Sequence, residues 1–491
     1  MQLSLSSTPI AEADSPCIVI AAAEGGALSH SAQEIDRASD GRLSHLLESR
    51  DVNTSMGKTT MLHGLPGIAA ERLMVIGVGK QEKLSAARWD RACLAAGQAL
   101  RDHPLTECHV FAHDLEIDGV DTNWRLRQLA LALQRANYLY TSTKRRKDDA
   151  PVPLKAATFH DGPGAEQAIE ESRGMAKGFL KARHLGDLPP NICNPAYLAQ
   201  EAKAIAAAYD KVELEVLEAA DMAELGMDAL LGVARGSANN PKLIVLKYSG
   251  AKPDGQPVVM VGKGVTFDTG GISLKPPPNM DEMKMDMCGA AGVMGAFVAC
   301  AELGLALNVV CIVPAVENMP DGNAYRPGDV LTSMSGKTIE IRNTDAEGRL
   351  ILCDALTYAA RFKPRYLIDA ATLTGACVVA LGHHASGLMS NDDTLAQRLL
   401  DAGEKSMDRA WRLPIWEEYL EQLETPFADI KNVGGMPAGV ITAGVFLSRF
   451  AKDQAWAHLD VAGSAWKWGE TEGATGRPTG LLTQFLIDLA R

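Results

Sequence analysis

Acidic side chains and lysines gather in two stretches of the chain that are rich in turn-forming residues. The stretches are 258-VVMVGKGVTFDTGGISLKPPPNMDEMKMDMCGAAG-292 and 337-KTIEIRNTDAEGRLILCDAL-356. Together they supply four carboxylates and two lysines: Asp268, Asp286, Asp345, Glu347, Lys263 and Lys275. This is enough oxygen-donor charge to neutralise two divalent cations. A lysine can ligate a metal only as the neutral amine, whereas a second lysine can stay charged and act as an electrophile.

The elements around these residues suggest how they could meet. Each stretch begins with an apolar, β-branched run and continues into a helical pattern, so a strand leads into a helix in both. If 343–349 is extended across that junction, Asp345, Glu347 and Arg349 share one surface. In a parallel sheet this surface lies at the carboxyl end of a strand, where ligands usually bind.

Plainer interpretations exist for each residue taken singly. Acidic residues before a helix often serve as caps and dipole partners, lysines are usually surface charges, and glycines supply turn geometry. The coincidence of two such clusters in one domain favours a metal site. Other chemistries have no anchor, because the chain lacks G-x-S-x-G, H-E-x-x-H and a complete phosphate loop.

The wider pattern indicates an α/β protein of two domains. Short β-rich runs alternate with helices over residues 1–160, which predicts a smaller N-terminal α/β domain. A helical pattern ended by two prolines predicts a linker helix within 161–190. Residues 191–491 then alternate strands with longer helices, which predicts a larger catalytic α/β domain with a mostly parallel central sheet.

Composition restricts the partners and the location. A net charge of −13 argues against a protein that coats nucleic acid, and the basic run 144-KRRK-147 is better explained as a solvated loop. The longest apolar runs are too short to span a bilayer and the N-terminus does not resemble a signal peptide, so we expect no membrane partner. Nine scattered cysteines without a C-x-x-C pair are typical of a reducing compartment, which predicts the cytoplasm.

At these two clusters the sequence resembles the leucyl aminopeptidase family, a group of cytosolic di-metal exopeptidases that includes bacterial aminopeptidase A. The octapeptide 343-NTDAEGRL-350 matches the family signature, and VGKGVTFDTGGISLKP and MKMDMCGAAG match its other metal-binding blocks. The resemblance covers most of residues 160–491. The N-terminal domain matches only in length and α/β character, and an oligomeric or regulatory role is expected for it.

The resemblance implies a role for each site residue. Asp268 and Glu347 would bridge two metal ions, Lys263 and Asp286 would complete one site, and Asp345 the other. Lys275 would contact the scissile carbonyl oxygen and Arg349 would hold a bicarbonate ion. The metals would be Mn²⁺, Zn²⁺ or Mg²⁺. The first residue of the substrate would be bound by Met283, Asn343, Thr372, Leu373 and Gly375.

The resemblance also implies an activity and an assembly. The expected activity is hydrolysis of the N-terminal peptide bond of peptides, with leucine and other apolar residues preferred, by a homohexamer built as a dimer of trimers. Two alternatives remain open from the sequence. One is an additional DNA-binding, regulatory role, as bacterial aminopeptidase A admits, and the other is a di-metal hydrolase of another substrate class, such as phosphoesters.

Overall fold

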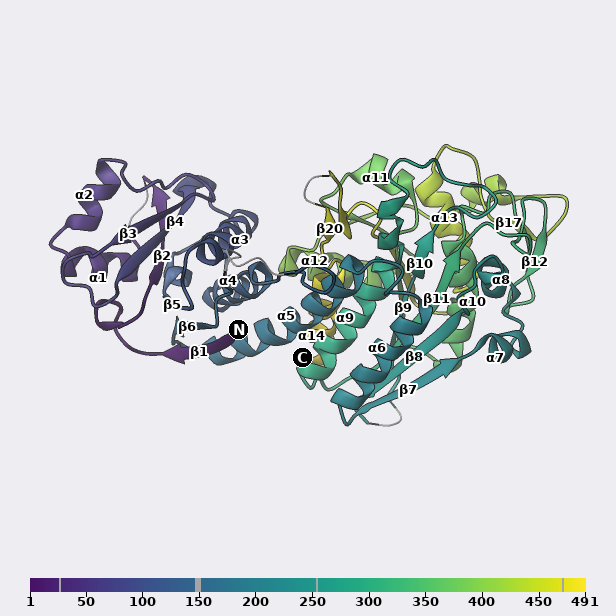
Figure 1. Ribbon diagram of the computed structural model, residues 1–491, viewed down its shortest axis with the longest axis horizontal. Coiled ribbons are helices and arrows are strands. Elements are labelled where there is room, and N and C mark those ends of the chain that lie inside the picture. The colour runs from purple at the N-terminus through teal and green to yellow at the C-terminus, as the bar shows by residue number, and fades with distance from the viewer. Residues whose placement is uncertain (26–27, 146–151, 253–254, 470–471) are drawn as a thin grey trace. The chain divides into compact units, whose positions relative to one another are not determined.

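Each of the units Met1–Ala176 and Lys177–Arg491 is built around one large sheet. The computed structural model describes residues 1–25, 28–145, 152–252, 255–469 and 472–491 (Figure 1). Part of the basic run expected to form a loop, residues 146–147, lies outside the described residues. The two-domain α/β class predicted from the sequence is confirmed.

The sheet of the first unit has six strands in the order β1-β6-β5-β2-β4-β3, all paired in parallel except β3 with β4. Its strands are β1 (Gln2–Ser6), β2 (Ile18–Glu24), β3 (Thr59–His63), β4 (Arg72–Lys80), β5 (Glu107–Val110) and β6 (Ala156–His160). The apolar runs of β2 and β4 are almost wholly buried, as expected for central strands covered on both faces.

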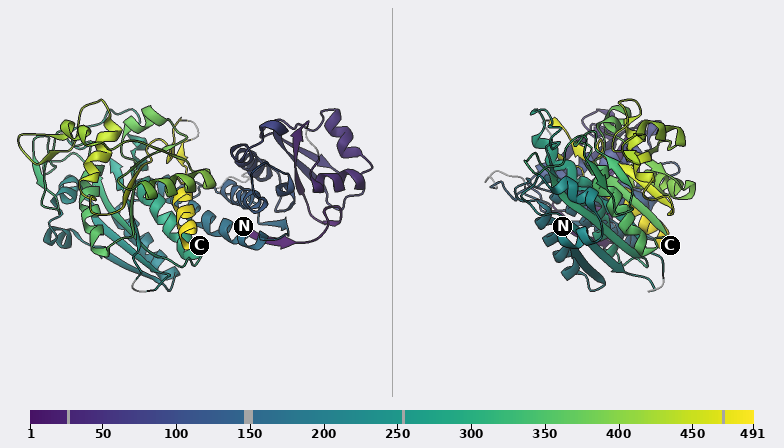
Figure 2. Two further views of the ribbon diagram at one scale, coloured as in Figure 1. Left: turned by 180° about the vertical axis from the view of Figure 1, so that it is seen from behind. Right: turned by 90° about the vertical axis from the view of Figure 1, so that its right-hand side faces the viewer.

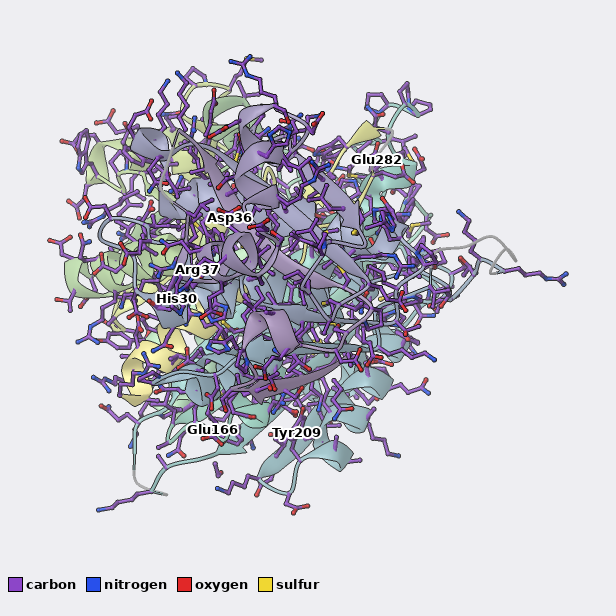
Figure 3. All side chains as sticks on the ribbon, turned by 90° about the vertical axis from the view of Figure 1, so that its left-hand side faces the viewer. His30, Asp36, Arg37, Glu166, Tyr209 and Glu282 are labelled. Carbon is purple, nitrogen blue, oxygen red and sulfur yellow. The ribbon has the colours of Figure 1, made fainter. Side chains whose placement is uncertain are left out.

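Helices cover this sheet on both faces. They are α1 (His30–Ala38), α2 (Arg42–Glu48), α3 (Ala86–Asp102) and α4 (Thr122–Ala136), with the short 3-10 helices η1 (Ile10–Glu12), η2 (Gln81–Lys83) and η3 (Ala112–Asp114). One core includes α3 and α4, and the other includes α1 and α2. The sequence did not predict α1 and α2. They are short, and Asp36 (labelled in Figure 3) joins them by accepting hydrogen bonds from Ser44 N and Ser44 Oγ, both at 2.7 Å.

Helix α5 (Ala165–Asp187) lies within the range predicted for the linker, and the division between the units falls inside it, after Ala176. In the first unit, Ala165, Ala168 and Ile169 join the core that contains α3 and α4. In the second unit, a Cβ on Gly178 would lie 2.2 Å from the carbonyl oxygen of Gly295. This glycine therefore permits a close approach between two helix backbones.

The central sheet of the second unit follows the order β16-β15-β18-β14-β9-β11-β8-β7, and β10 also pairs with β11. Its middle is parallel, because β18, β14, β9, β11 and β10 pair in that sense, whereas β8 and β7 are antiparallel. The strands are β7 (Val212–Leu217), β8 (Lys242–Ser249), β9 (Val258–Gly262), β10 (Gly264–Asp268), β11 (Asn308–Asn318), β14 (Tyr366–Ala371), β15 (Ser386–Ser390), β16 (Ala410–Arg412) and β18 (Trp456–Asp460).

Helices pack on both faces of this sheet. The helices α6 (Pro195–Ala208), α9 (Cys288–Glu302), α12 (Asp393–Ser406) and α14 (Thr479–Ala490) contact one another or the strands on one side, and α14, yellow in Figures 1 and 2, packs against α9 and α12. The helices α8 (Asp228–Ala234), α10 (Gly348–Ala359) and α13 (Gly439–Ser448) form the other layer. The remaining helices are α7 (Ala219–Glu224), α11 (Gly375–Leu381), η4 (Asp281–Met287), η5 (Ala360–Phe362) and η6 (Glu417–Leu423).

One detail of the sequence interpretation is wrong. The strand that precedes the second acidic cluster, β13 (Thr338–Glu340), is not in the central sheet but in a small sheet with β12 (Val330–Thr332) and β17 (Ile430–Lys431). A further pair is formed by β19 (Trp466–Lys467) and β20 (Gly473–Ala474). The second cluster therefore reaches the site from outside the parallel sheet.

One helical stretch, Asp281–Glu302, is long and apolar enough to cross a membrane by length and composition, but 89% of its most apolar window is buried inside the protein. The stretch joins η4 to α9, and α9 packs against β9, β14 and α14. Its apolar surface is thus used in internal packing.

Candidate metal centre

The candidate site lies at the ends of β9, β10 and β14, three strands in the parallel middle of the central sheet. Lys263 directly follows β9, Asp268 is the last residue of β10, and Thr372 follows β14. The register between β10 and β11 shifts between Val265 and Phe267. Such an irregularity changes the direction of the side chains that follow it, and the side chain of Asp268 follows this one.

Lys263 connects two of the acidic segments. Its Nζ lies 2.7 Å from Asp286 Oδ1 and 2.7 Å from Glu347 Oε1, and it donates to the carbonyl oxygen of Thr372 at 3.0 Å. Lys263, Asp286 and Glu347 are all buried. Asp286 is carried by η4, which is fixed in part by the buried Glu282 (labelled in Figure 3), whose carboxylate accepts from Trp466 Nε1 at 2.7 Å.

Lys275 connects the remaining carboxylates. Its Nζ lies 2.7 Å from Asp268 Oδ2 and also pairs with Asp345. The other oxygen of Asp268 accepts from Gly270 N at 2.9 Å and from Asn318 Nδ2 at 2.8 Å. All six residues singled out as metal ligands or as an electrophile are thereby brought into one connected cluster.

Burial and neighbouring charges shift the pKa values in this cluster. Burial and the nearby Glu347 raise the pKa of Asp268 to about 6, and burial raises that of Asp286 well above its usual range. The pKa of Glu347 is lowered, because Lys263 and Lys275 outweigh its burial. Both lysine pKa values are raised, since the surrounding carboxylates outweigh the burial of the ammonium groups. For Asp268 and Asp286, burial therefore outweighs the attraction to the two lysines.

Close backbone approaches explain two of the glycines. Gly270 has a φ of +86°, and a Cβ there would lie 2.8 Å from Asp345 Oδ1. A Cβ on Gly348 would lie 2.6 Å from Lys263 Cε and 2.8 Å from its Nζ. Any larger residue at either position would displace a member of the cluster.

Arg349 is placed differently from the sequence prediction. The backbone is not extended over 343–349, because it turns at 344–345 and is helical from Gly348. Arg349 is buried, and its Nη1 donates to the carbonyl oxygen of Asn432 at 2.7 Å, while its Nε has no partner among the described residues. Burial lowers its pKa to about 10, against the pull of Glu347 and Asp460, so the guanidinium stays charged at neutral pH.

The residues predicted to bind the substrate differ in their exposure. Thr372 is buried, Asn343, Leu373 and Met283 are half-buried, and Gly375 is exposed at the start of α11. The side chain of Asn343 accepts from Asp345 N at 2.8 Å, which closes the turn before α10.

Sequence reasoning missed several residues that hold the site. Asn432 donates to the carbonyl oxygen of Asn343 at 2.7 Å and accepts from Arg342 N at 2.8 Å, in addition to its contact with Arg349. Asn318 and Tyr325 both donate to the carbonyl oxygen of Thr344, at 3.0 and 2.7 Å. The signal in the sequence that points to Asn432 is the adjacent loop 433-VGGMPAG-439, because loops rich in glycine and proline often carry functional residues.

The donor set fits divalent metal ions. One ligand atom from each of Asp268, Asp286 and Glu347 lies within 4.8 Å of the others, and all three residues are buried. Asp286 Oδ2 and Glu347 Oε2 are buried atoms with no hydrogen-bond partner among the described residues. Carboxylate oxygens at such spacing are the ligands that hard divalent ions prefer. Fold and site together define a two-domain α/β protein with a buried, carboxylate-rich cluster whose donor atoms suit divalent metal ions.

Comparisons with known proteins agree with this class. The catalytic domain of the cytosol aminopeptidase family matches residues 180–486, and the N-terminal domain of that family matches residues 19–147. Probable cytosol aminopeptidases of Azotobacter vinelandii and Methylobacillus flagellatus are 51% and 50% identical to this chain, with 99% of both chains covered in each comparison.

Solved structures give the same result. A mutant of tomato leucine aminopeptidase matches with a TM-score of 0.88 at 31% identity, covering 99% of this chain and 96% of that one. The bottromycin maturation enzyme BotP in complex with Mn matches with a TM-score of 0.84 at 31% identity, covering 97% and 100%. The chain belongs to the cytosol aminopeptidase family and is an aminopeptidase of that family.

Proposed function

We propose that this protein removes the N-terminal residue from peptides, with leucine and other apolar residues preferred, by means of two divalent metal ions. The observation that carries the proposal is the buried convergence of Asp268, Asp286 and Glu347 on one spot, with Lys263 and Lys275 between the carboxylates. The structural similarity to tomato leucine aminopeptidase supports the leucine preference.

The metal ligands would be Lys263, Asp268, Asp286, Asp345 and Glu347. Asp268 and Glu347 would serve both ions, Lys263 and Asp286 one, and Asp345 the other. Divalent ions bound there would supply Lewis-acid activation of water and of the scissile carbonyl group. Mn²⁺ is supported by the Mn complex of BotP, and Zn²⁺ or Mg²⁺ would suit the same donors. Because Lys263 must be neutral to ligate, metal binding there is coupled to loss of its proton.

The other charged residues would act on the substrate. Lys275 would stay an ammonium and would donate a hydrogen bond to the carbonyl oxygen as negative charge develops on it. Arg349 would hold bicarbonate through its Nε, which has no partner among the described residues, and bicarbonate would supply a proton carrier toward the leaving amine.

The pocket for the first side chain would be formed by Met283, Asn343, Thr372, Leu373 and Gly375. Two of these, Met283 and Leu373, are half-buried apolar side chains and can still bury surface against a ligand. Methionine adapts its shape easily, so the pocket is expected to accept several apolar residues.

We further propose a homohexamer, built as a dimer of trimers, in which residues 1–160 act in assembly or regulation, 161–190 link and 191–491 catalyse. The names of the relatives support a cytoplasmic location. The described part of the chain offers no observation in favour of DNA binding, and the test of that alternative is a gel-shift titration against salt.

The test is hydrolysis of a leucyl anilide by chelated enzyme, followed by addition of Mn²⁺, Zn²⁺ or Mg²⁺ in turn. We expect activity only after a metal is added, and almost none in Glu347→Ala or Lys275→Ala, which should still form the wild-type oligomer. Glu171→Gln, a change at a buried glutamate that pairs with Arg127 in the first unit, is the control. Full activity in either site variant, or hydrolysis of a phosphodiester but not of the anilide, would overturn the proposal.

A further inference from the structure

Thr372 contacts two proposed ligands of the same metal ion at once. Its hydroxyl donates to Asp286 Oδ1 at 2.8 Å, and its carbonyl oxygen accepts from Lys263 Nζ at 3.0 Å. The hydroxyl also lies 3.1 Å from the carbonyl oxygen of Asp286. These contacts leave Asp286 Oδ2 without a partner among the described residues. One buried threonine thus fixes which oxygen of Asp286 is available and from which side Lys263 approaches.

The two residues after Thr372 are held by a second buried carboxylate. Asp460, fully buried at the end of β18, accepts from Thr374 Oγ1 at 2.7 Å and from Leu373 N at 3.3 Å. A third donor, Ala462 N, lies 3.1 Å away. The strand register places Asp460 directly beside Ala371, so the carboxylate lies next to the start of the loop that it holds.

We propose that Asp460 and Thr374 form a tether that positions Thr372, and that Thr372 orients Lys263 and Asp286 for the metal ion they share. Asp460 and Thr374 are positioning residues, because they act only through the loop 372–374. This inference rests on the proposed metal binding and adds a determinant of metal affinity outside the ligand set. Hydrogen-bond partners of metal ligands commonly contribute 10- to 100-fold to affinity, and the contribution falls when the partner is one step further away.

The chemistry of the tether explains why a charged residue is buried there. A carboxylate only accepts hydrogen bonds, and its two oxygens serve three donors at once here. In Asp460→Asn, an amide NH₂ would face the Thr374 hydroxyl, which already accepts from Cys377 N at 3.0 Å. The hydroxyl could then only accept a second hydrogen bond, so the charge-assisted bond that it donates to Asp460 would be replaced by a weaker neutral one without any change in the size of the side chain.

The test measures metal affinity and not turnover. Free Mn²⁺ is counted by its paramagnetic resonance signal while metal-stripped full-length protein is titrated. We expect Thr372→Val to weaken the affinity of one of the two sites by about tenfold or more, and Thr374→Val and Asp460→Asn by about threefold. Thr372→Ser and Thr374→Ser keep the hydroxyls and should restore wild-type affinity.

Thr483→Val is the matched control. Thr483 is fully buried in α14, and its hydroxyl has no partner among the described residues, so the same chemical change there should leave both sites at wild-type affinity. Asp460→Asn should lower the Mn²⁺ affinity of Thr372→Val by a smaller factor than it lowers that of the wild type. Part of the effect of Asp460 passes through the Thr372 hydroxyl, which the valine variant lacks.

If Thr372→Val binds Mn²⁺ with wild-type affinity, the proposal that Thr372 orients Lys263 and Asp286 is wrong. This holds even if the protein hydrolyses the leucyl anilide. Equal losses of Mn²⁺ affinity in the valine and serine variants would also overturn the proposal. They would show that the shape of the threonine side chain matters and its hydroxyl does not. If Asp460→Asn fails to fold, the threonine pairs decide alone. Wild-type protein that binds Mn²⁺ with the expected ranking of variants, but does not cleave the anilide, would overturn the proposed function and leave the tether standing.

Discussion

Replacement of Gly348 by alanine should lower activity by displacing Lys263. Gly348 begins α10 and does not have a left-handed backbone, so alanine fits its conformation and would favour the helix by up to about 1 kcal/mol. The added Cβ, however, would lie 2.6 Å from Lys263 Cε, where ordinary contacts begin at 3.4 Å. The end of Lys263 must therefore move by roughly 1 Å, which would break its 2.7 Å contacts with Asp286 and Glu347.

A misplacement of about 1 Å at a reacting centre can cost roughly 100-fold in rate, so we expect kcat/KM for a leucyl anilide to fall by about that factor. The midpoint of thermal unfolding should fall as well, because a gain of up to about 1 kcal/mol in helix propensity does not offset two broken contacts between buried charges. Gly322→Ala is the control, because a Cβ there meets nothing within 4 Å. If Gly348→Ala keeps kcat/KM within about twofold of the wild type, the position of Lys263 does not limit the reaction and the reasoning fails.

Three further predictions concern stability. Attraction to Asp369 outweighs burial and raises the pKa of His458, so the pair should stabilise the fold fully below the unfolded pKa of about 6.5 and lose that contribution as the pH rises through the raised value. The difference in thermal midpoint between wild type and His458→Asn, measured from pH 5 to 9, should therefore shrink with pH; a constant difference would contradict the pairing. Phe297→Ala should cost about 3–5 kcal/mol in urea unfolding, because the side chain is fully buried in α9; a cost below about 1 kcal/mol would contradict its role in the core. Chelation should lower the thermal midpoint of the protein, and Mn²⁺ at 100 times its dissociation constant should restore about 2.7 kcal/mol; no shift on chelation would mean that the metal does not bind the folded state preferentially.

The parts of the fold that follow a regular pattern were predicted well. The apolar, β-branched runs that form β2, β4, β8, β9 and β14 can be read from the sequence alone, and the order of strands and helices predicted the mostly parallel central sheet. The short helices α1 and α2 were missed, because a helix of two turns shows little periodicity and here depends on the side-chain contacts of Asp36 with Ser44. The sheet to which β13 belongs was not predicted correctly, because the residues of a strand do not determine which strands it pairs with.

The candidate site was predicted as a set of residue types more than as a geometry. Lys263, Asp268 and Asp286 lie within one sequence stretch, so their proximity could be inferred from it. The turn at 344–345 could not be inferred from the sequence, because it depends on the hydrogen bonds of Asn343 with Asp345 and of Asn432 with Asn343. Contacts between residues about 90 positions apart leave no trace in local spacing.

The charges of the cluster favour metal binding over a network of ion pairs among its own residues. Four carboxylates face two ammonium groups, so two negative charges lack a local partner, and burial of the cluster raises the pKa values of Asp268, Asp286 and Asp345 despite the two lysines. If the cluster were only a structural network of ion pairs, a third and a fourth cation should lie within it, as buried charges are otherwise costly. Arg349 does not fill that role, because its Nη1 is turned to the carbonyl oxygen of Asn432. Two divalent ions would supply the missing charge and would leave Lys275 and Arg349 as surplus positive groups, which is the balance needed to attract an anion and to stabilise a developing oxyanion.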